Sequence, residues 1–223
     1  RMPASSQAFN QNNTENTIQV SNTRILSPRA VNETRFEWQR NASGQNALTS
    51  GPSINVLGVF AAGGNPLGVN SITTNHYEVQ NYTSMVHGNH FMRMGGRLRA
   101  TDESSLSTRN FNGTYIFDSL AAFQSGAPRQ LTITTGNPLI SNTFVDAGLY
   151  AEDDWKLRPN MTLSYGLRFE TQNGIGDHAD WAPRIGFAWG VGPKKNAAPK
   201  TVIRTGFGIF YDRFGQDLIL QSK

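Results

Sequence analysis

Apolar and polar residues alternate with a period of two along much of this sequence, which is the pattern of β-strands. In residues 161–170, Leu163, Leu167 and Phe169 share one side, and Ser164 and other polar or small residues take the other. A strand of about ten residues is long enough to cross a bilayer when it is tilted. The alternation predicts eight strands, at residues 17–26, 31–40, 77–86, 91–100, 144–155, 161–170, 183–191 and 201–211, and it is least regular in 17–26 and 77–86.

Short and long connections alternate between these strands. The short ones contain Pro, Gly or Asn, which favour turns, and lie at residues 27–30, 87–90, 157–160 and, somewhat longer, 192–200. The long ones cover residues 41–75, 101–142 and 171–180. Outer-membrane barrels have this layout, with short periplasmic turns and long extracellular loops. We therefore predict an all-β fold, an antiparallel up-and-down transmembrane β-barrel segment whose eight or so strands form an open, curved sheet.

The long connections contain signals for local structure of their own. Residues 111–117 predict a strand that extends above the membrane, and residues 118–123 predict a short helix capped by Asp118 or Ser119. Residues 63–66 predict a turn. The first fifteen or so residues are rich in Asn, Gln and Ser, and we interpret them as a loop carried over from a preceding strand.

The composition supports strands and turns and excludes several kinds of site. Only 16% of residues are charged and 37% are hydrophobic, with a mean hydropathy of -0.45. There is no cysteine, which excludes disulfides and thiolate metal sites. The net charge is +4 and the basic residues are scattered, so no nucleic-acid partner is expected. No stretch has the roughly 18 uncharged apolar residues of a membrane helix.

Charged residues on the polar side of the alternation are the candidates for a ligand path. In a barrel these positions face the lumen, where side chains tune selectivity. The alternatives are plain lining of a water-filled lumen and salt contacts to a plug. The candidates are Arg35, Glu37, Arg93, Arg97, Arg99, Arg168, Glu170, Arg184 and Arg204.

The apolar side of the same strands is predicted to face outer-membrane lipid. The lipid-facing candidates are Phe36, Trp38, Met92, Met94, Leu149, Leu163, Tyr165, Leu167, Phe169, Ile185, Phe187, Ile203, Phe207 and Ile209. The four tryptophans, Trp38, Trp155, Trp181 and Trp189, lie near predicted strand ends, where amphipathic rings suit a membrane interface. Trp181 lies beside a long connection, so stacking on a sugar remains its alternative.

Three short motifs could indicate a metal site, an acidic site or a dinucleotide-binding site. His87 and His90 could ligate a metal, but no cysteine or adjacent carboxylate completes the set, so we interpret them as turn residues. Residues 152–154 are acidic, and Asp153 falls on the apolar side near the predicted periplasmic rim, where a charge costs little. Residues 206–208 begin a dinucleotide fingerprint but lack its third glycine and its helix. No catalytic set stands out, so we expect no enzymatic activity, cofactor or metal.

Several sequence segments resemble the barrels of TonB-dependent receptors, and most closely those of the Oar-like group. The clearest is residues 148–170, which resemble a hairpin of that barrel, followed by residues 182–189 and 205–214, which resemble its next two strands. Residues 111–114 and 133–138 fit the loops of that group. The resemblance implies the wall and extracellular loops of a receptor in the Gram-negative outer membrane, which takes up an unknown extracellular ligand.

The resemblance also implies parts that this sequence does not show. Such receptors have about 22 strands, a plug domain and a segment that contacts the TonB system. We therefore expect residues 1–223 to be an internal fragment of a larger barrel, coupled to TonB through a plug outside it. The alternatives are a passive porin or small eight-stranded barrel, a surface adhesin and, last, a soluble carbohydrate-binding domain.

Overall fold

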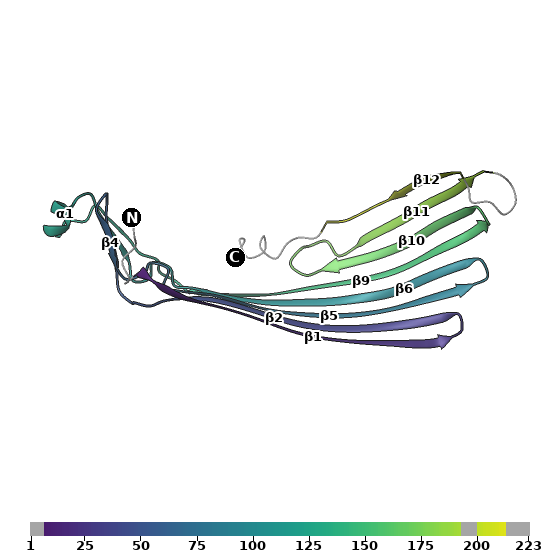
Figure 1. The fold of residues 1–223 in the computed structure, drawn as a ribbon, viewed down its shortest axis with the longest axis horizontal. Coiled ribbons are helices and arrows are strands. Elements are labelled where there is room, and N and C mark those ends of the chain that lie inside the picture. The colour runs from purple at the N-terminus through teal and green to yellow at the C-terminus, as the bar shows by residue number, and fades with distance from the viewer. Residues whose placement is uncertain (1–6, 193–199, 213–223) are drawn as a thin grey trace. The chain divides into compact units, whose positions relative to one another are not determined.

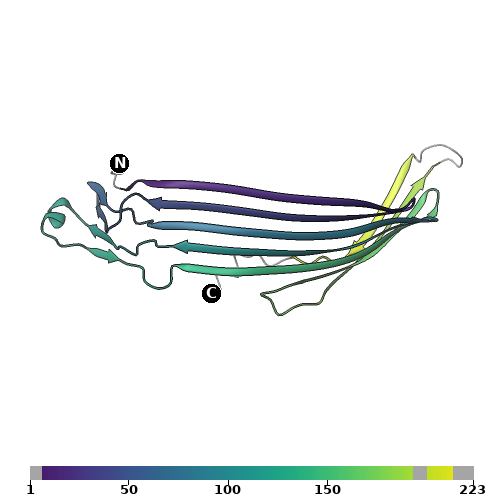
Figure 2. The same ribbon diagram turned by 90° about the horizontal axis from the view of Figure 1, so that it is seen from below.

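The computed structural model describes residues 7–192 and 200–212 of the chain. Eight antiparallel strands form one sheet, and their order across the sheet is their order along the chain (Figures 1 and 2). In sheet order these strands are β1 (Phe9–Ser27), β2 (Ala30–Ala47), β5 (Val69–His87), β6 (His90–Ser107), β9 (Leu139–Arg158), β10 (Met161–Gln172), β11 (Asp180–Val191) and β12 (Thr201–Gly208). The edges β1 and β12 do not pair with each other, so the described sheet is open and the predicted fold class is confirmed.

The long strands pass through two units, which are described separately. Unit 1 consists of the described residues among 1–17, 39–75 and 102–143. Unit 2 consists of those among 18–38, 76–101 and 144–223. In the described part of the chain, no helix has the length and apolar content needed to cross a membrane.

Unit 1 contains strand segments that the sequence alternation did not predict. β1 begins at Phe9, so the interpretation as a loop is wrong for residues 9–15, whereas residues 1–6 lie outside the described residues. Side-chain amides join β1 to β2 here: Gln39 Nε2 donates to Glu15 Oε1 at 2.8 Å, and Gln45 Nε2 donates to the Gln11 side-chain oxygen at 3.5 Å. Both faces of these segments are mainly polar. They can still form strands, since backbone hydrogen bonds between paired strands do not require an apolar side.

Unit 1 also holds a small sheet built from the long connections. Its strands lie in the order β4 (Phe60–Gly63), β3 (Ser53–Val56), β7 (Thr114–Phe117) and β8 (Gln130–Thr132). β3 and β7 are parallel and the other pairs are antiparallel. The strand predicted at residues 111–117 is therefore present from Thr114, but it belongs to this small sheet and not to the eight-stranded one.

A short helix, α1 (Leu120–Gln124), contacts β7 of the small sheet. The Ser119 hydroxyl accepts a hydrogen bond from the backbone N–H of Ala122 at 3.1 Å, which confirms the predicted helix and selects Ser119 as its cap. The Phe123 ring meets Phe60 and Phe117 edge to face, with centroids 5.4 and 5.3 Å apart. Val56 is fully buried, so this cluster is the core of unit 1.

In unit 2 the pairing register carries the sequence alternation across the sheet. Leu163 of β10 lies opposite Trp155 of β9 and Phe187 of β11. Ser164 lies opposite Asp154 and Gly186. Because directly opposed residues project from the same face, unit 2 has an apolar face, which carries Leu163, Leu167 and Phe169, and a polar face, which carries Ser164, Gly166 and Arg168.

Some predicted boundaries differ from the structure. β12 ends at Gly208, so Ile209 lies beyond the strand, although its N–H still donates to the Pro183 carbonyl at 3.1 Å. Trp38 lies well inside β2 rather than near its end, because β2 continues through polar residues to Ala47. Most of the predicted connection at residues 192–200 falls outside the described residues.

The aromatic cluster gives a test of the small sheet. Phe123→Ala removes both edge-to-face contacts and should lower the local opening free energy of β7 by about 2 kcal/mol. Hydrogen exchange of the β7 amides measures this value. Leu120→Ala is the control, because Leu120 is on the same helix and is 44% exposed. Equal effects of the two substitutions would show that Phe123 does not anchor the helix.

Candidate functional site

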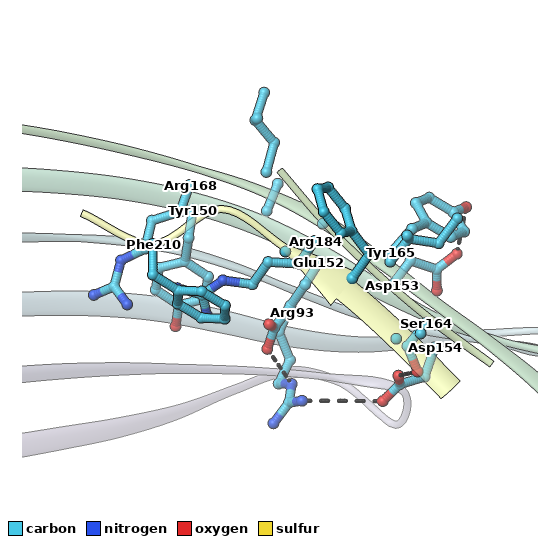
Figure 3. Close-up of a pocket in the computed structure, with 18 of the residues that line it drawn as sticks. Arg93, Tyr150, Glu152, Asp153, Asp154, Ser164, Tyr165, Arg168, Arg184 and Phe210 are labelled. Carbon is cyan, nitrogen blue, oxygen red and sulfur yellow. Dashed lines mark hydrogen bonds and ion pairs between the residues drawn. The ribbon is translucent and has the colours of Figure 1, made fainter. Parts of the chain in front are cut away.

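On the polar face of unit 2, ion pairs join residues of different strands and also residues two apart along one strand. Arg93 of β6 reaches two carboxylates of β9, at 2.9 Å from Glu152 and 3.9 Å from Asp154 (Figure 3). Arg168 of β10 pairs with Glu170 of the same strand at 2.8 Å. The polar face is therefore a surface of alternating charges, which suits a water-filled space better than a packed apolar core.

Asp146 is the most buried carboxylate of this face. Its side chain is only 2% exposed, and it lies 2.7 Å from Arg99 Nε and 3.8 Å from an Arg97 terminal nitrogen. The two arginines are about a quarter exposed. One buried carboxylate thus holds two guanidinium groups of β6 in place.

The main cavity of unit 2 is lined from β5 to the segment after β12, largely by residues of this face. Its volume is about 810 Å³, which is within the usual range of small-molecule sites. The charged side chains that line it include Arg93, Glu152, Asp154, Arg168 and Arg184, and the rings include Tyr82, Tyr150 and Phe210 (Figure 3). Unlike the ion-paired arginines, Arg184 has Phe210 as its contact, with the guanidinium carbon 4.7 Å from the ring centroid.

Glycines form part of the wall of this cavity. Gly166 of β10 lies opposite Arg184, and Gly186 of β11 lies opposite Ser164 and Gly206. A Cβ added at Gly166 would come within 2.8 Å of the Glu152 Cβ, so glycine is required there for close packing of β9 and β10. A Cβ added at Gly186 would make only ordinary van der Waals contact, at 3.8 Å from the Ser164 Cβ and the Thr205 carbonyl oxygen, so packing does not require glycine there.

The structure brings only some of the sequence-predicted candidates together. Arg93, Arg168 and Arg184 line the main cavity. Arg97 and Glu170 line an adjoining recess with Arg168 and Arg184. The remaining candidates lie elsewhere on unit 2: Arg99 at Asp146, Arg35 beside Glu33 and 3.3 Å from the Tyr82 hydroxyl, Glu37 accepting from Gln19 at 3.2 Å, and Arg204 opposite Ala188. Their role as a ligand path stays a prediction.

Several cavity residues were not selected from the sequence. The sequence indicates Glu152 and Asp154 only as acids at the rim, because their pairing with Arg93 depends on the register between β6 and β9. Phe210 follows the end of β12, but it continues the even-numbered parity of Arg204 and the glycines 206 and 208. This even-numbered parity is the sequence signal that places the Phe210 ring on the polar side.

The apolar face carries a polar cluster beside the short turns. His90 Nδ1 lies 2.6 Å from Asp153 Oδ2, and the Tyr165 hydroxyl donates to the same oxygen at 2.8 Å. His90 also stacks on Trp155, with centroids 5.2 Å apart. His90 therefore does have a carboxylate neighbour, which the sequence did not indicate. Within residues 7–192 and 200–212, no group of three or more His, Cys, Asp or Glu side chains could hold a metal ion.

An antiparallel up-and-down sheet with one apolar face and one charged face is the arrangement that the wall of a membrane β-barrel requires. The chain belongs to the outer membrane beta barrel domain family, whose model matches residues 2–179 and 170–222. It is an outer-membrane protein of a Gram-negative bacterium, as the sequence predicted. No curated protein matches the chain.

The buried carboxylate on the polar face gives a prediction about stability. Asp146→Asn leaves Arg97 and Arg99 side by side without their shared negative charge. We expect a loss of about 2–3 kcal/mol, below the roughly 3–5 kcal/mol of a fully buried pair, because both arginines are partly exposed. Urea unfolding in lipid vesicles measures it. Asp154→Asn should cost less than about 1 kcal/mol, since the Asp154 side chain is 40% exposed; a larger loss for Asp154→Asn would contradict this ranking.

The two faces of β10 give a second prediction. Leu163→Arg and Leu167→Arg each place a charge on the predicted lipid side, at a cost of about 2–4 kcal/mol near the bilayer midplane, and should prevent assembly. Ser164→Arg, one residue away on the polar face, should be tolerated. The fraction of protein in the outer membrane that resists urea extraction measures assembly. If all three variants assembled equally, the predicted lipid-facing assignment would be wrong.

Proposed function

We propose that this chain supplies barrel wall and extracellular loops to a TonB-dependent receptor that takes up a ligand across the outer membrane. The observation that carries the proposal is the length of the strands. β1, β2, β5, β6 and β9 have 18 to 20 residues each, whereas a tilted membrane strand needs only about 9–11. About half of each strand is therefore available outside the bilayer.

The composition of the strands supports this division. In unit 2 the strands alternate between apolar and polar residues, as the register of β9 to β12 shows. In unit 1 the segment of β1 from residue 9 to 17 has Phe9 as its single apolar residue, and the segment of β2 from residue 39 to 47 has only alanines. Strands that are polar on both sides belong in water, where they can surround a ligand before it reaches the membrane.

The long connections, at the opposite end of the strands from the short turns, also support a receptor. The links between β2 and β5 and between β6 and β9 contain the small sheet and α1, with Phe117 and Val56 as a buried core. A folded element of this kind offers a defined surface for ligand capture, which a passive pore does not need. It also suits an adhesin, so the choice between uptake and adhesion depends on energy coupling.

The open sheet favours a wide barrel over a small one. A closed eight-stranded barrel fills its interior with side chains. Here β1 and β12 form opposite edges of the described sheet, and sheet edges cannot remain unpaired in hydrocarbon. We infer that further strands complete the barrel and that a plug fills its lumen and provides the contact to the TonB system. The resemblance of residues 148–170 and 205–214 to Oar-like receptors supports the same assignment.

Energy coupling provides the test. Cells that produce the complete protein, and cells without it, are grown in a defined mixture of solutes, and depletion of each solute is measured with and without a protonophore. A TonB-dependent receptor should deplete at least one solute only when the protein is present, and this depletion should collapse when the proton gradient is removed.

Two outcomes would contradict the proposal. Protein-dependent depletion that persists with the protonophore would indicate a passive pore. Protein-dependent attachment of cells to a surface, without depletion of any solute, would indicate an adhesin. The Leu163→Arg variant, which should not assemble, provides the matched control for both measurements.

A further inference from the structure

We propose that Arg184 is the binding residue for the carboxylate of a small, flat, singly charged solute held in the main cavity of unit 2. The inference rests on the proposed function, since this solute, or one like it, would be the ligand that moves along the polar face. It assigns a chemical class to that ligand.

The surroundings of Arg184 distinguish it from the other cavity arginines. Its partners in the register are Gly166 on β10 and Gly208 on β12, and its same-face neighbours along β11 are Ala182 and Gly186. None of these four positions carries a side chain that could form an ion pair. Arg184 therefore lies at the centre of a bowl of small residues.

Charge pairing on the described polar face leaves Arg184 available. Arg93 pairs with Glu152 and Asp154, and Arg168 pairs with Glu170. The ion pairs of residues 7–192 and 200–212 include none for Arg184, and its Nε is buried without a hydrogen-bond partner among them. A buried donor without an acceptor favours a ligand that supplies one, and a guanidinium offers a carboxylate two parallel donors.

The shape of the bowl selects a flat ligand. A Cβ at Gly186 would make only ordinary van der Waals contact, at 3.8 Å from the Ser164 Cβ and the Thr205 carbonyl oxygen, so the bowl is not closed over this glycine. Without side chains, a ring can approach the backbone closely. The Phe210 ring stays 70% exposed while it contacts the Arg184 guanidinium, so it offers a surface on which a second ring can stack. Figure 3 shows Phe210 and Arg184 side by side at this wall of the cavity.

The remaining charges select a ligand with one negative charge. Within the main cavity, Glu152 and Asp154 share Arg93, which leaves one negative charge in excess beside the bowl, and Asp212 adds a carboxylate to the adjoining recess that Arg184 also lines. Arg184 supplies one positive charge that offsets it. A phosphate or dicarboxylate would bring a second negative charge close to these acids and would be repelled. A monocarboxylate satisfies Arg184 without that repulsion.

Benzoate is the probe for this site, because it is flat and carries one carboxylate. Its binding to the complete protein, purified from outer membranes in detergent, is measured by titration calorimetry, with benzamide, phthalate and phosphate as comparisons. Benzoate should bind at least about tenfold more tightly than each of them. Arg184→Gln should weaken benzoate binding at least about tenfold, since that factor corresponds to the loss of one charge-assisted contact.

Two further variants protect the test against misfolding. Gly186→Val fills the bowl but keeps the charge of Arg184, and it should also abolish benzoate binding. Arg158→Gln removes a charge at the end of β9, outside the residues that line the cavity, and should bind benzoate as the unmodified protein does. Resistance to urea extraction confirms that each variant has assembled.

Three results would overturn the proposal: equal binding of benzoate and benzamide, benzoate binding that survives Arg184→Gln, and no benzoate binding by the unmodified protein. The last would indicate that a protein segment occupies the bowl. The solute-depletion experiment is independent of these results, because binding in detergent needs no proton gradient. Benzoate binding without gradient-dependent depletion would refute TonB coupling and leave the Arg184 site standing.

Discussion

The pairing register of β9, β10 and β11 is the constraint on which the two faces of unit 2 depend. Leu163 lies between Trp155 and Phe187, whereas Ser164 lies between Asp154 and Gly186. Because side chains alternate with a period of two, a shift of one residue would exchange the faces of a whole strand. In a bilayer that shift would place charges in hydrocarbon and is excluded by its cost. The membrane therefore fixes the register that assembles the polar face.

The same constraint explains why Arg184 has no ionic partner within the part of the chain that the structure describes. Its neighbours across β10 and β12 are Gly166 and Gly208. Elsewhere the register places acids within reach of arginines on adjacent strands, as Asp146 lies beside Arg99. Ion pairing across strands is thus the ordinary state of this face, and the glycines around Arg184 interrupt it.

The membrane part of the fold could be predicted from sequence, because alternation is strong wherever one face must be apolar. β10 was predicted from residue 161 to 170 and extends from Met161 to Gln172. The polar half of β1 was missed, because strands with water on both sides need no alternation and are held by pairs such as Gln39 and Glu15. The parallel pairing of β3 with β7 joins segments about 60 residues apart, and no local pattern encodes such a contact. The alternation alone was enough to select the candidate arginines of the polar face. Their ion-pair partners could not be predicted, because those depend on the pairing register between strands.

Two tryptophans of β11 indicate where the bilayer lies on unit 2. Trp181 and Trp189 are on the apolar face, opposite Phe169 and Met161, and both rings are partly exposed. Eight residues separate them, or about 27 Å along a strand, and a barrel tilt of 35–45° reduces this to about 20 Å. The apolar band of such barrels is about 25 Å tall between its aromatic girdles. The Asp153–His90–Tyr165 cluster lies toward the Trp189 end, beside the short turns. If the apolar face meets lipid as the sequence predicts, this carboxylate lies at the interface, where headgroups and water are within reach and a charge can be retained.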